Sequence, residues 1–357
     1  MKIRLRTAAI LAAFALILSG CWDSKSIDNR LLPVIMGVDR IPGRDGYIVS
    51  LRIPDPKSGE FHAIRAEAKT ISEALDQIRM NEERSIDVLH LTLILLGREL
   101  AEEGVTDVLV YAMRAREIKS KAFLVITEGT AYEMIGGQKN VRKESGKQML
   151  DLFSRDGGWT PYVALTSVWE GYRDAHSNTA DMALPIIELG DNTLFHIVGS
   201  AAFRDGRIAE IISPEETFLY NLYRNRFKGA IVEVTDSASL QIVGANVSNR
   251  TSWKGDTPKL ESTLRLKTIV MEANEGAAQS TEKIRKDLER MLNRRFRELM
   301  VKLQRNRSDI LMTGVIFRNK LSPDQIEKWE ERYYPKLDFD IRVQVDVRNT
   351  GNLKMPQ

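Results

Sequence analysis

Residue types that supply covalent cross-links are nearly absent from this 357-residue chain. Cys21 is the only cysteine, which excludes disulfide bonds within the chain. After residue 20, no apolar run reaches the roughly 18 residues that a membrane-spanning helix needs, and neither low-complexity tracts nor repeats of fixed period occur. The chain must therefore fold around hydrophobic cores, and its length suits about two or three domains.

The sequence also lacks a large net charge. Its 52 lysines and arginines are nearly balanced by 49 aspartates and glutamates, and the net charge of +3 equals the contribution of Lys2, Arg4 and Arg6. Without these three N-terminal residues the chain is electrically neutral. Bulk electrostatics therefore give no reason to expect nucleic-acid binding.

Motifs of the common metal and catalytic centres are missing as well. The four histidines, His62, His90, His176 and His196, are scattered, and no H-E-x-x-H, calcium-loop, Walker or G-x-S-x-G motif occurs. We therefore predict no metal, no cofactor and no enzymatic activity. His90 stands within the apolar run 89–97, which predicts a buried strand residue rather than a ligand.

One short match to a nucleophilic motif remains. Ser280 and Lys283 have the S-x-x-K spacing of penicillin-recognising enzymes, but the companion motifs S-D-N and K-T-G are missing. A serine or threonine is expected before the helix that follows in any case, because its side chain caps the first turn. A cap is the favoured interpretation, and an envelope hydrolase is the alternative.

The single cysteine stands at the end of an apolar N-terminal segment. The basic residues at 2, 4 and 6 precede an apolar run at 8–18 of about a dozen residues, too short to span a membrane but typical of an export signal. Leu18, Ser19, Gly20 and Cys21 resemble the lipobox of bacterial lipoproteins. That resemblance implies a signal peptide at 1–20 and a covalent lipid, S-diacylglycerol with an N-acyl group, on Cys21.

Local patterns predict both strands and helices. A turn at 42–46 joins two strands, and Asp205 with Gly206 predicts a second hairpin between 195–203 and 207–212. Thr70 and Thr130 start capping boxes, Ser213 precedes a proline-led helix, and Thr160 before Pro161 predicts another helix start. The mixture indicates α+β domains.

The C-terminal part gives the clearest periodicities. Apolar residues recur every three or four positions in a long helix at 282–306, and Trp329 and Tyr333, one turn apart in a later helix, are expected to pack in a core. Strict alternation at 339–347 predicts a strand with one buried face.

Basic residues outnumber acidic ones on the long helix. They suggest a surface for anionic lipid headgroups or an acidic partner. An ordinary solvated helix face is the competing interpretation. The candidate residues are Arg285, Arg290, Arg294, Arg297 and Lys302.

Several segments in order resemble the Ger(x)C family, the lipoprotein C subunits of spore germinant receptors. "LSGCWDSKSID" is similar to its lipobox and following start, and "LHLTLILLGRELAEEGV" to its His-Leu strand and helix, with Arg98 where an acidic residue is common. "TISEALDQIRM", "VGSAAFRDGRIAEIISPEETFLYNLY" and "YPKLDFDIRVQVDVRNTG" resemble its first helix, hairpin and closing segment.

This resemblance implies a three-domain α+β lipoprotein, for which we expect mixed, largely antiparallel sheets packed with helices. The expected divisions are the signal peptide at 1–20, a strand-rich start of the first domain at 21–69, a second α/β region at 70–190 whose end can return to the first domain, and a C-terminal α+β domain at 191–357.

The resemblance also implies a function. The protein would be a non-enzymatic subunit, anchored by lipid to the outer face of the spore inner membrane, that assembles with a large A subunit and a multi-pass B subunit in nutrient-triggered germination. Only Cys21 carries over as a residue with a defined role. The alternative from the anchor and length alone is a substrate-binding lipoprotein of a membrane transporter.

Overall fold

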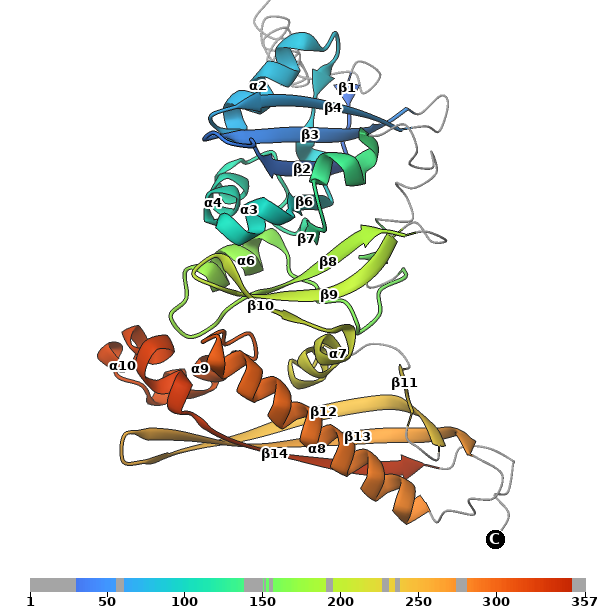
Figure 1. Cartoon of the computed structure of the whole chain (residues 1–357), viewed down its shortest axis with the longest axis vertical. Helices are drawn as coiled ribbons and strands as arrows, with labels where there is room; N and C mark the ends of the chain where they lie inside the picture. The colour runs from blue at the N-terminus through green and yellow to red at the C-terminus, as the bar shows by residue number, and fades with distance from the viewer. Residues whose placement is uncertain are drawn as a thin grey trace, which may run out of the picture.

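The computed structural model describes residues 30–55, 61–137, 150, 152–153, 157–190, 195–226, 231–234, 238–273 and 281–348. These residues form an elongated molecule in which two sheet units follow one another along the long axis (Figure 1). The first unit lies at the end where β1 (Arg30–Leu31) begins the described chain, and the C-terminal unit lies at the opposite end. We find no helix among the described residues that combines the length and apolar composition needed to cross a bilayer.

The first unit is built on one eight-stranded sheet with the order β10-β9-β8-β7-β6-β2-β3-β4. Its strands are β2 (Ile35–Arg40), β3 (Tyr47–Pro54), β4 (Phe61–Ala68), β6 (Leu93–Gly97), β7 (Phe123–Thr127), β8 (Ala183–Leu189), β9 (Phe195–Arg204) and β10 (Arg207–Ile212). The central strands β2, β6, β7 and β8 are parallel, whereas the pairs on both flanks are antiparallel. A separate short ladder joins β1 to β5 (Ser85–Ile86).

Both faces of the central strands are covered. The helices α2 (Ile71–Asn81), α3 (Arg98–Glu103), α4 (Thr106–Arg114) and α6 (Val168–Ala175) contribute to one core cluster, which also takes in Ile94 and Leu96 of β6. Leu93 and Leu95 point into a second cluster with Phe153 and with η3 (Glu133–Gly137). Successive residues of a strand face opposite sides, so the fully apolar sequence of β6 fits a strand buried on both faces.

The expectation of largely antiparallel sheets was wrong for the centre of this sheet. Parallel neighbours need a crossover connection, and α3 with α4 supplies it between β6 and β7, as α6 does between β7 and β8. The sheet also continues across the expected divisions at 69/70 and 190/191, since β2 pairs with β6 and β8 pairs with β9. The mixed α+β class is confirmed, and the division into three domains remains a prediction.

The C-terminal unit holds a four-stranded sheet with the order β11-β12-β13-β14. Its strands are β11 (Ile231–Val234), β12 (Ala238–Lys254), β13 (Thr257–Ala273) and β14 (Asp338–Arg348). Its helices are α7 (Pro214–Tyr223), α8 (Thr281–Arg305), α9 (Thr313–Phe317), η4 (Arg318–Lys320), α10 (Pro323–Glu327), η5 (Trp329–Tyr333) and η6 (Tyr334–Lys336). The alternation predicted at 339–347 is confirmed, because Ile341, Val343 and Val345 are buried while their neighbours are exposed.

Helix α8 confirms the long helix predicted from periodicity and runs along the sheet of the C-terminal unit (Figure 1). Its apolar stripe is buried from Ile284 to Leu303. Two of its polar side chains accept hydrogen bonds from the backbone of β14: Asn293 from Val343 N at 3.0 Å and Glu289 from Val345 N at 2.9 Å. Since β14 is an edge strand, α8 thereby satisfies amide groups that would otherwise be open to pairing with another chain.

Two local predictions were wrong. No helix starts at Pro161, because a turn closed by Val163 N to Thr160 O at 3.0 Å is followed by a segment bonded to β7, with Leu124 N to Thr166 O at 3.0 Å. Helix α6 begins instead at Val168, where Ser167 and Glu170 form a capping box. His90 is exposed at the end of the short helix η2 (Val88–His90) rather than buried in a strand. The hairpin at Asp205 and the helix start at Ser213 are confirmed.

Candidate functional site

The predicted lipidation site and its cleavage motif, residues Leu18 to Cys21, lie outside the described residues. The described chain begins at Arg30, whose guanidinium forms an ion pair with Asp87 at 2.6 Å. This contact fixes the first described residue to the segment that follows β5. Ser280 of the S-x-x-K match also lies outside the described residues, while Lys283 is exposed on α8.

The five basic residues predicted as a surface on α8 divide into two groups. Arg285 lies between Glu282 at 2.6 Å and Glu289 at 2.8 Å, and Lys302 contacts Glu216 at 2.9 Å. These contacts neutralise much of their charge.

The remaining three residues of this set, Arg290, Arg294 and Arg297, are exposed. Arg290 contacts Asp287 at 3.3 Å and Arg294 contacts Glu298 at 3.9 Å, both within one turn of α8. Such exposed pairs are weak and exchange readily with solvent or another partner. The surface that α8 offers is therefore smaller than the sequence predicts.

The described residues contain no group of three or more histidine, cysteine, aspartate or glutamate side chains placed to hold a metal ion. All four histidines are exposed, and they lie on different elements. The arrangement that stands out is structural instead: a buried polar junction where the C-terminal unit meets the first unit, formed around Asp309.

Asp309 is fully buried in the turn that follows α8. Its carboxylate accepts hydrogen bonds from Thr313 N and Gly314 N, each at 2.8 Å, from Thr313 Oγ1 at 2.9 Å and from Trp329 Nε1 at 3.2 Å. It therefore satisfies the first amides of α9 and the indole of η5 together. A Cβ atom at Gly314 would lie 2.5 Å from that indole nitrogen, so the junction has no room for a larger residue there.

The same turn is bonded to the first unit. Asp181, just before β8, accepts from Asp309 N at 2.7 Å, and its own amide donates to Asp309 O at 3.2 Å. Ser308 Oγ donates to Phe203 O of β9 at 2.6 Å. At the surface, Glu331 of η5 forms ion pairs with Arg204 and with Arg307. These bonds join the two units through several independent contacts.

Carboxyl groups are concentrated at this junction. Burial and the neighbouring Glu330 raise the pKa of Asp181 well above its ordinary value. Burial also raises the pKa of Asp309, although the hydrogen bonds that its carboxylate accepts oppose this. For Glu330, burial and the nearby Asp205 raise the pKa from 4.5 to about 7, against the lowering effect of Arg204. The junction thus holds carboxyl groups that resist ionisation.

Replacing Glu330 by glutamine is expected to flatten the fall in stability as pH rises. Because the folded protein holds the Glu330 proton more tightly than the unfolded chain, the protonated carboxyl gives its full stabilisation below about pH 4.5, and this is lost as pH rises through about 7. Glutamine cannot ionise. The thermal midpoint of the variant should therefore exceed that of the parent increasingly between pH 5 and pH 8.

The control for this measurement is Glu327→Gln, the same change at an exposed residue of α10. Its midpoint should follow the parent at every pH. Parallel profiles for the parent and Glu330→Gln would contradict the assignment of a raised pKa to Glu330.

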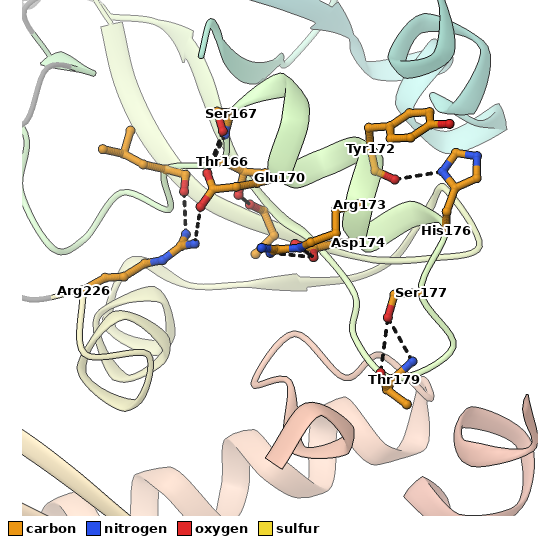
Figure 2. A network of polar contacts seen from close by, with 12 residues as sticks. Thr166, Ser167, Glu170, Tyr172, Arg173, Asp174, His176, Ser177, Thr179 and Arg226 are labelled. Carbon is orange, nitrogen blue, oxygen red and sulfur yellow. Dashed lines mark hydrogen bonds and ion pairs between the residues drawn. The ribbon is translucent and has the colours of Figure 1, made fainter. Parts of the chain in front are cut away.

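A second polar network joins the units on another side, between α6 and the end of α7 (Figure 2). Figure 2 shows Arg226 pointing toward Glu170. Its Nη2 lies 2.7 Å from the Glu170 carboxylate, and its Nη1 donates to Leu165 O at 2.7 Å. Glu170 also accepts from Ser167 N at 3.0 Å. Burial opposes ionisation of Glu170, but Arg226 and the Ser167 bonds outweigh it and lower its pKa. Close by, His176 Nδ1 lies 2.8 Å from Tyr172 O.

Neither network was predicted from the sequence, although one of them contains a recognisable motif. Ser167 and Glu170 have the S-x-x-E spacing of a capping box, whereas the sequence pattern favoured the wrong start, at Thr160 before Pro161. Asp309 has no comparable signature, because its partners include Trp329, which is 20 residues away. In both networks the hydroxyl groups that donate to a carboxylate, Ser167 to Glu170 and Thr313 to Asp309, stand at helix starts. The remaining contacts link the two units.

Comparison with protein families gives two matches in order along the chain. A model described as spore germination protein N-terminal domain matches residues 23–189. A second, described as spore germination B3/GerAC like, C-terminal, matches residues 198–351. Together they cover most of the chain, and the interval between them runs from the end of β8 into the start of β9.

Among characterised sequences, the chain is similar to spore germination protein KC of Bacillus subtilis (strain 168), at 21% identity over 392 residues, covering 96% of this chain and 95% of that protein. It is also similar to the putative spore germination protein YfkR of the same organism, at 21% identity over 386 residues with the same coverage. Among solved structures, the crystal structure of the GerBC protein superposes with a TM-score of 0.58 at 16% identity, covering 88% of this chain and 97% of that one. At this identity the superposition supports the fold.

Proposed function

Since this chain belongs to the GerAC-like family of spore germination proteins, C subunits of germinant receptors, we propose that it is a non-enzymatic, lipid-anchored subunit that assembles with membrane partners in nutrient-triggered germination. The observation that carries the proposal is the match of two germination family models, in order, over nearly the whole chain. The resemblance stated from short sequence segments is confirmed at the level of the family.

The proposed anchor is the lipid on Cys21. It is supported by the basic and apolar leader and by the position of the single cysteine directly after Leu18, Ser19 and Gly20. Two or more acyl chains hold a protein at a bilayer far more firmly than one. We place the protein at the outer face of the spore inner membrane, where exported lipoproteins of this kind would remain.

The proposed partners are a large A subunit and a multi-pass B subunit. The features of the described residues that suit this role are structural rather than catalytic: two sheet units fixed to each other by buried bonds around Asp309 and Glu170. A subunit that works by contact needs a stable surface, and this junction gives the two units one relative orientation. The exposed arginines of α8 offer one surface for such contact.

The alternative of a transporter binding protein is less well supported. That role calls for two lobes that open and close on a small ligand. Here the contact between the units is occupied by buried side chains, among them Asp309 and Ser308, which bond directly to the first unit. The packing argues against a ligand site between the lobes.

Purification of the tagged, full-length chain from dormant-spore membranes tests the proposed function. We expect an A-type and a B-type germination subunit to elute with it in constant ratio, with none eluting from untagged spores. Recovery of a transport permease with its nucleotide-binding subunit would contradict the proposal, as would recovery of the chain alone after mild solubilisation.

A further inference from the structure

Two large apolar side chains are exposed at the end of the molecule where the described chain begins. Met80, in the last turn of α2, exposes 76% of its surface, and Leu89, in η2, exposes 46%. Figure 1 shows α2 and β1 at the same end of the long axis, away from the C-terminal unit. Both side chains therefore leave apolar surface open to a contact at this end.

Leu89 is connected directly to the start of the described chain. Arg30 lies opposite Ser85 in the ladder between β1 and β5. Asp87 lies two residues after Ser85. One of its carboxylate oxygens accepts a hydrogen bond from the Arg30 guanidinium at 2.6 Å, and the other accepts a hydrogen bond from Leu89 N at 3.0 Å. One carboxylate therefore holds Leu89 close to the point where the chain enters the fold.

The length of chain before Arg30 limits how far this end can lie from the lipid. Cys21 precedes Arg30 by nine residues. A fully extended chain spans at most about 3.5 Å per residue, so the two residues can be separated by only about 30 Å. An anchor on Cys21 thus keeps the end that carries Leu89 near the bilayer.

We propose that this end of the protein rests on the outer leaflet, with Leu89 and Met80 in contact with the boundary between lipid headgroups and acyl chains. The inference depends on the proposed anchor at Cys21. Arg79, just before Met80, is paired with Asp76 and Glu117. The exposed Glu83 and Arg84, between Met80 and Leu89 in the sequence, are of opposite sign, so the contact is apolar rather than an attraction to anionic lipid.

This orientation has a consequence for α8. The helix belongs to the unit at the opposite end of the long axis (Figure 1), so a molecule standing on Leu89 and Met80 holds Arg290, Arg294 and Arg297 away from the headgroups. Of the two roles that the sequence suggested for the basic residues, contact with an acidic partner then fits better than contact with lipid.

The single cysteine makes the contact measurable. Once Cys21 carries lipid, a new cysteine is the only free thiol and can take one fluorescent label. The test uses the full lipidated protein with Leu89→Cys or Met80→Cys, inserted into vesicles of phosphatidylethanolamine and phosphatidylglycerol with brominated acyl chains. Matched controls are Val315→Cys and Met271→Cys, since these side chains expose 43% and 54% of their surface and belong to the C-terminal unit.

The fluorescence of labels at positions 89 and 80 is expected to be quenched at least about twofold more strongly than that of the control labels. The reason is that only groups in contact with lipid reach the brominated acyl chains. Equal quenching at all four positions, in protein that floats with the vesicles, would overturn this orientation and leave the anchor intact. Protein that does not float at all would contradict the anchor itself, and the orientation with it. The two positions are independent, so a defect in one variant does not decide the result.

Discussion

Replacing Cys21 by alanine is expected to remove the protein from the spore membrane fraction and to abolish the germination response that depends on it. The physical reason is the loss of the acyl chains, because each buried methylene contributes about 0.8 kcal/mol to membrane binding. Without the tether, the protein dilutes away from its membrane partners and the assembly is lost by mass action. The measurements are immunoblots of fractionated spore membranes and the loss of spore refractility after addition of nutrient.

The matched control is Ser24→Ala, three residues after the cysteine, which leaves the thiol and the preceding residues unchanged. These spores should retain the protein in the membrane and germinate at the parental rate. Spores with Cys21→Ala that keep the protein in the membrane and germinate normally would refute the anchor.

Replacing Asp309 by alanine is expected to lower the free energy of unfolding by roughly 4 kcal/mol, since buried donors left without an acceptor cost about 1–3 kcal/mol each and do not add fully. The change removes the acceptor for two amides of α9, the Thr313 hydroxyl and the Trp329 indole. It also opens a cavity between the two units. Chemical denaturation of the purified protein, followed by tryptophan fluorescence, measures the loss.

Asp340→Ala provides the control for Asp309, because it makes the same substitution at an exposed residue of β14. Its effect should stay within about 0.5 kcal/mol, as for most exposed sites. An Asp309 variant that unfolds at the same denaturant concentration as the Asp340 variant would contradict the central role assigned to this carboxylate.

Sequence predicted best the features that depend on neighbouring residues. The stripe of α8 and the alternation of β14 each repeat over many positions, so a single misplaced residue does not hide the period. The turn at Asp205 and the cap at Ser213 are equally local. These signals follow from backbone geometry, and tertiary contacts confirm them.

The features that failed depend on residues far apart in the chain. The parallel centre of the large sheet was missed although the unbroken apolar run of β6 is typical of a strand buried on both faces. Which strands become neighbours depends on residues far apart in the chain, as in the pairing of β2 with β6. Thr160 has the pattern of a cap, but residues 161–163 form a turn, and the path to α6 is set by partners such as Asn221, which donates to Pro161 O at 2.7 Å. Tertiary hydrogen bonds here replaced the ones a helix would have made.

The candidate surface on α8 also depends on residues far apart in the chain, which the sequence pattern does not bring together. The sequence places five basic residues on one helix, but it does not reveal that Lys302 meets Glu216 of α7, 86 residues earlier. The buried junction at Asp309 was likewise invisible, because its acceptor and donors come from separate turns and helices. The role of Cys21, in contrast, rests on sequence alone and stays a prediction.

The most direct test of the account is the mass of the N-terminal peptide of the protein purified from native spore membranes. We predict that this peptide begins at Cys21 and carries a diacylglycerol on sulfur and an acyl chain on nitrogen. A peptide that begins elsewhere, with an unmodified Cys21, would contradict the claim that this protein is held to the membrane by lipid to dock with its neighbours.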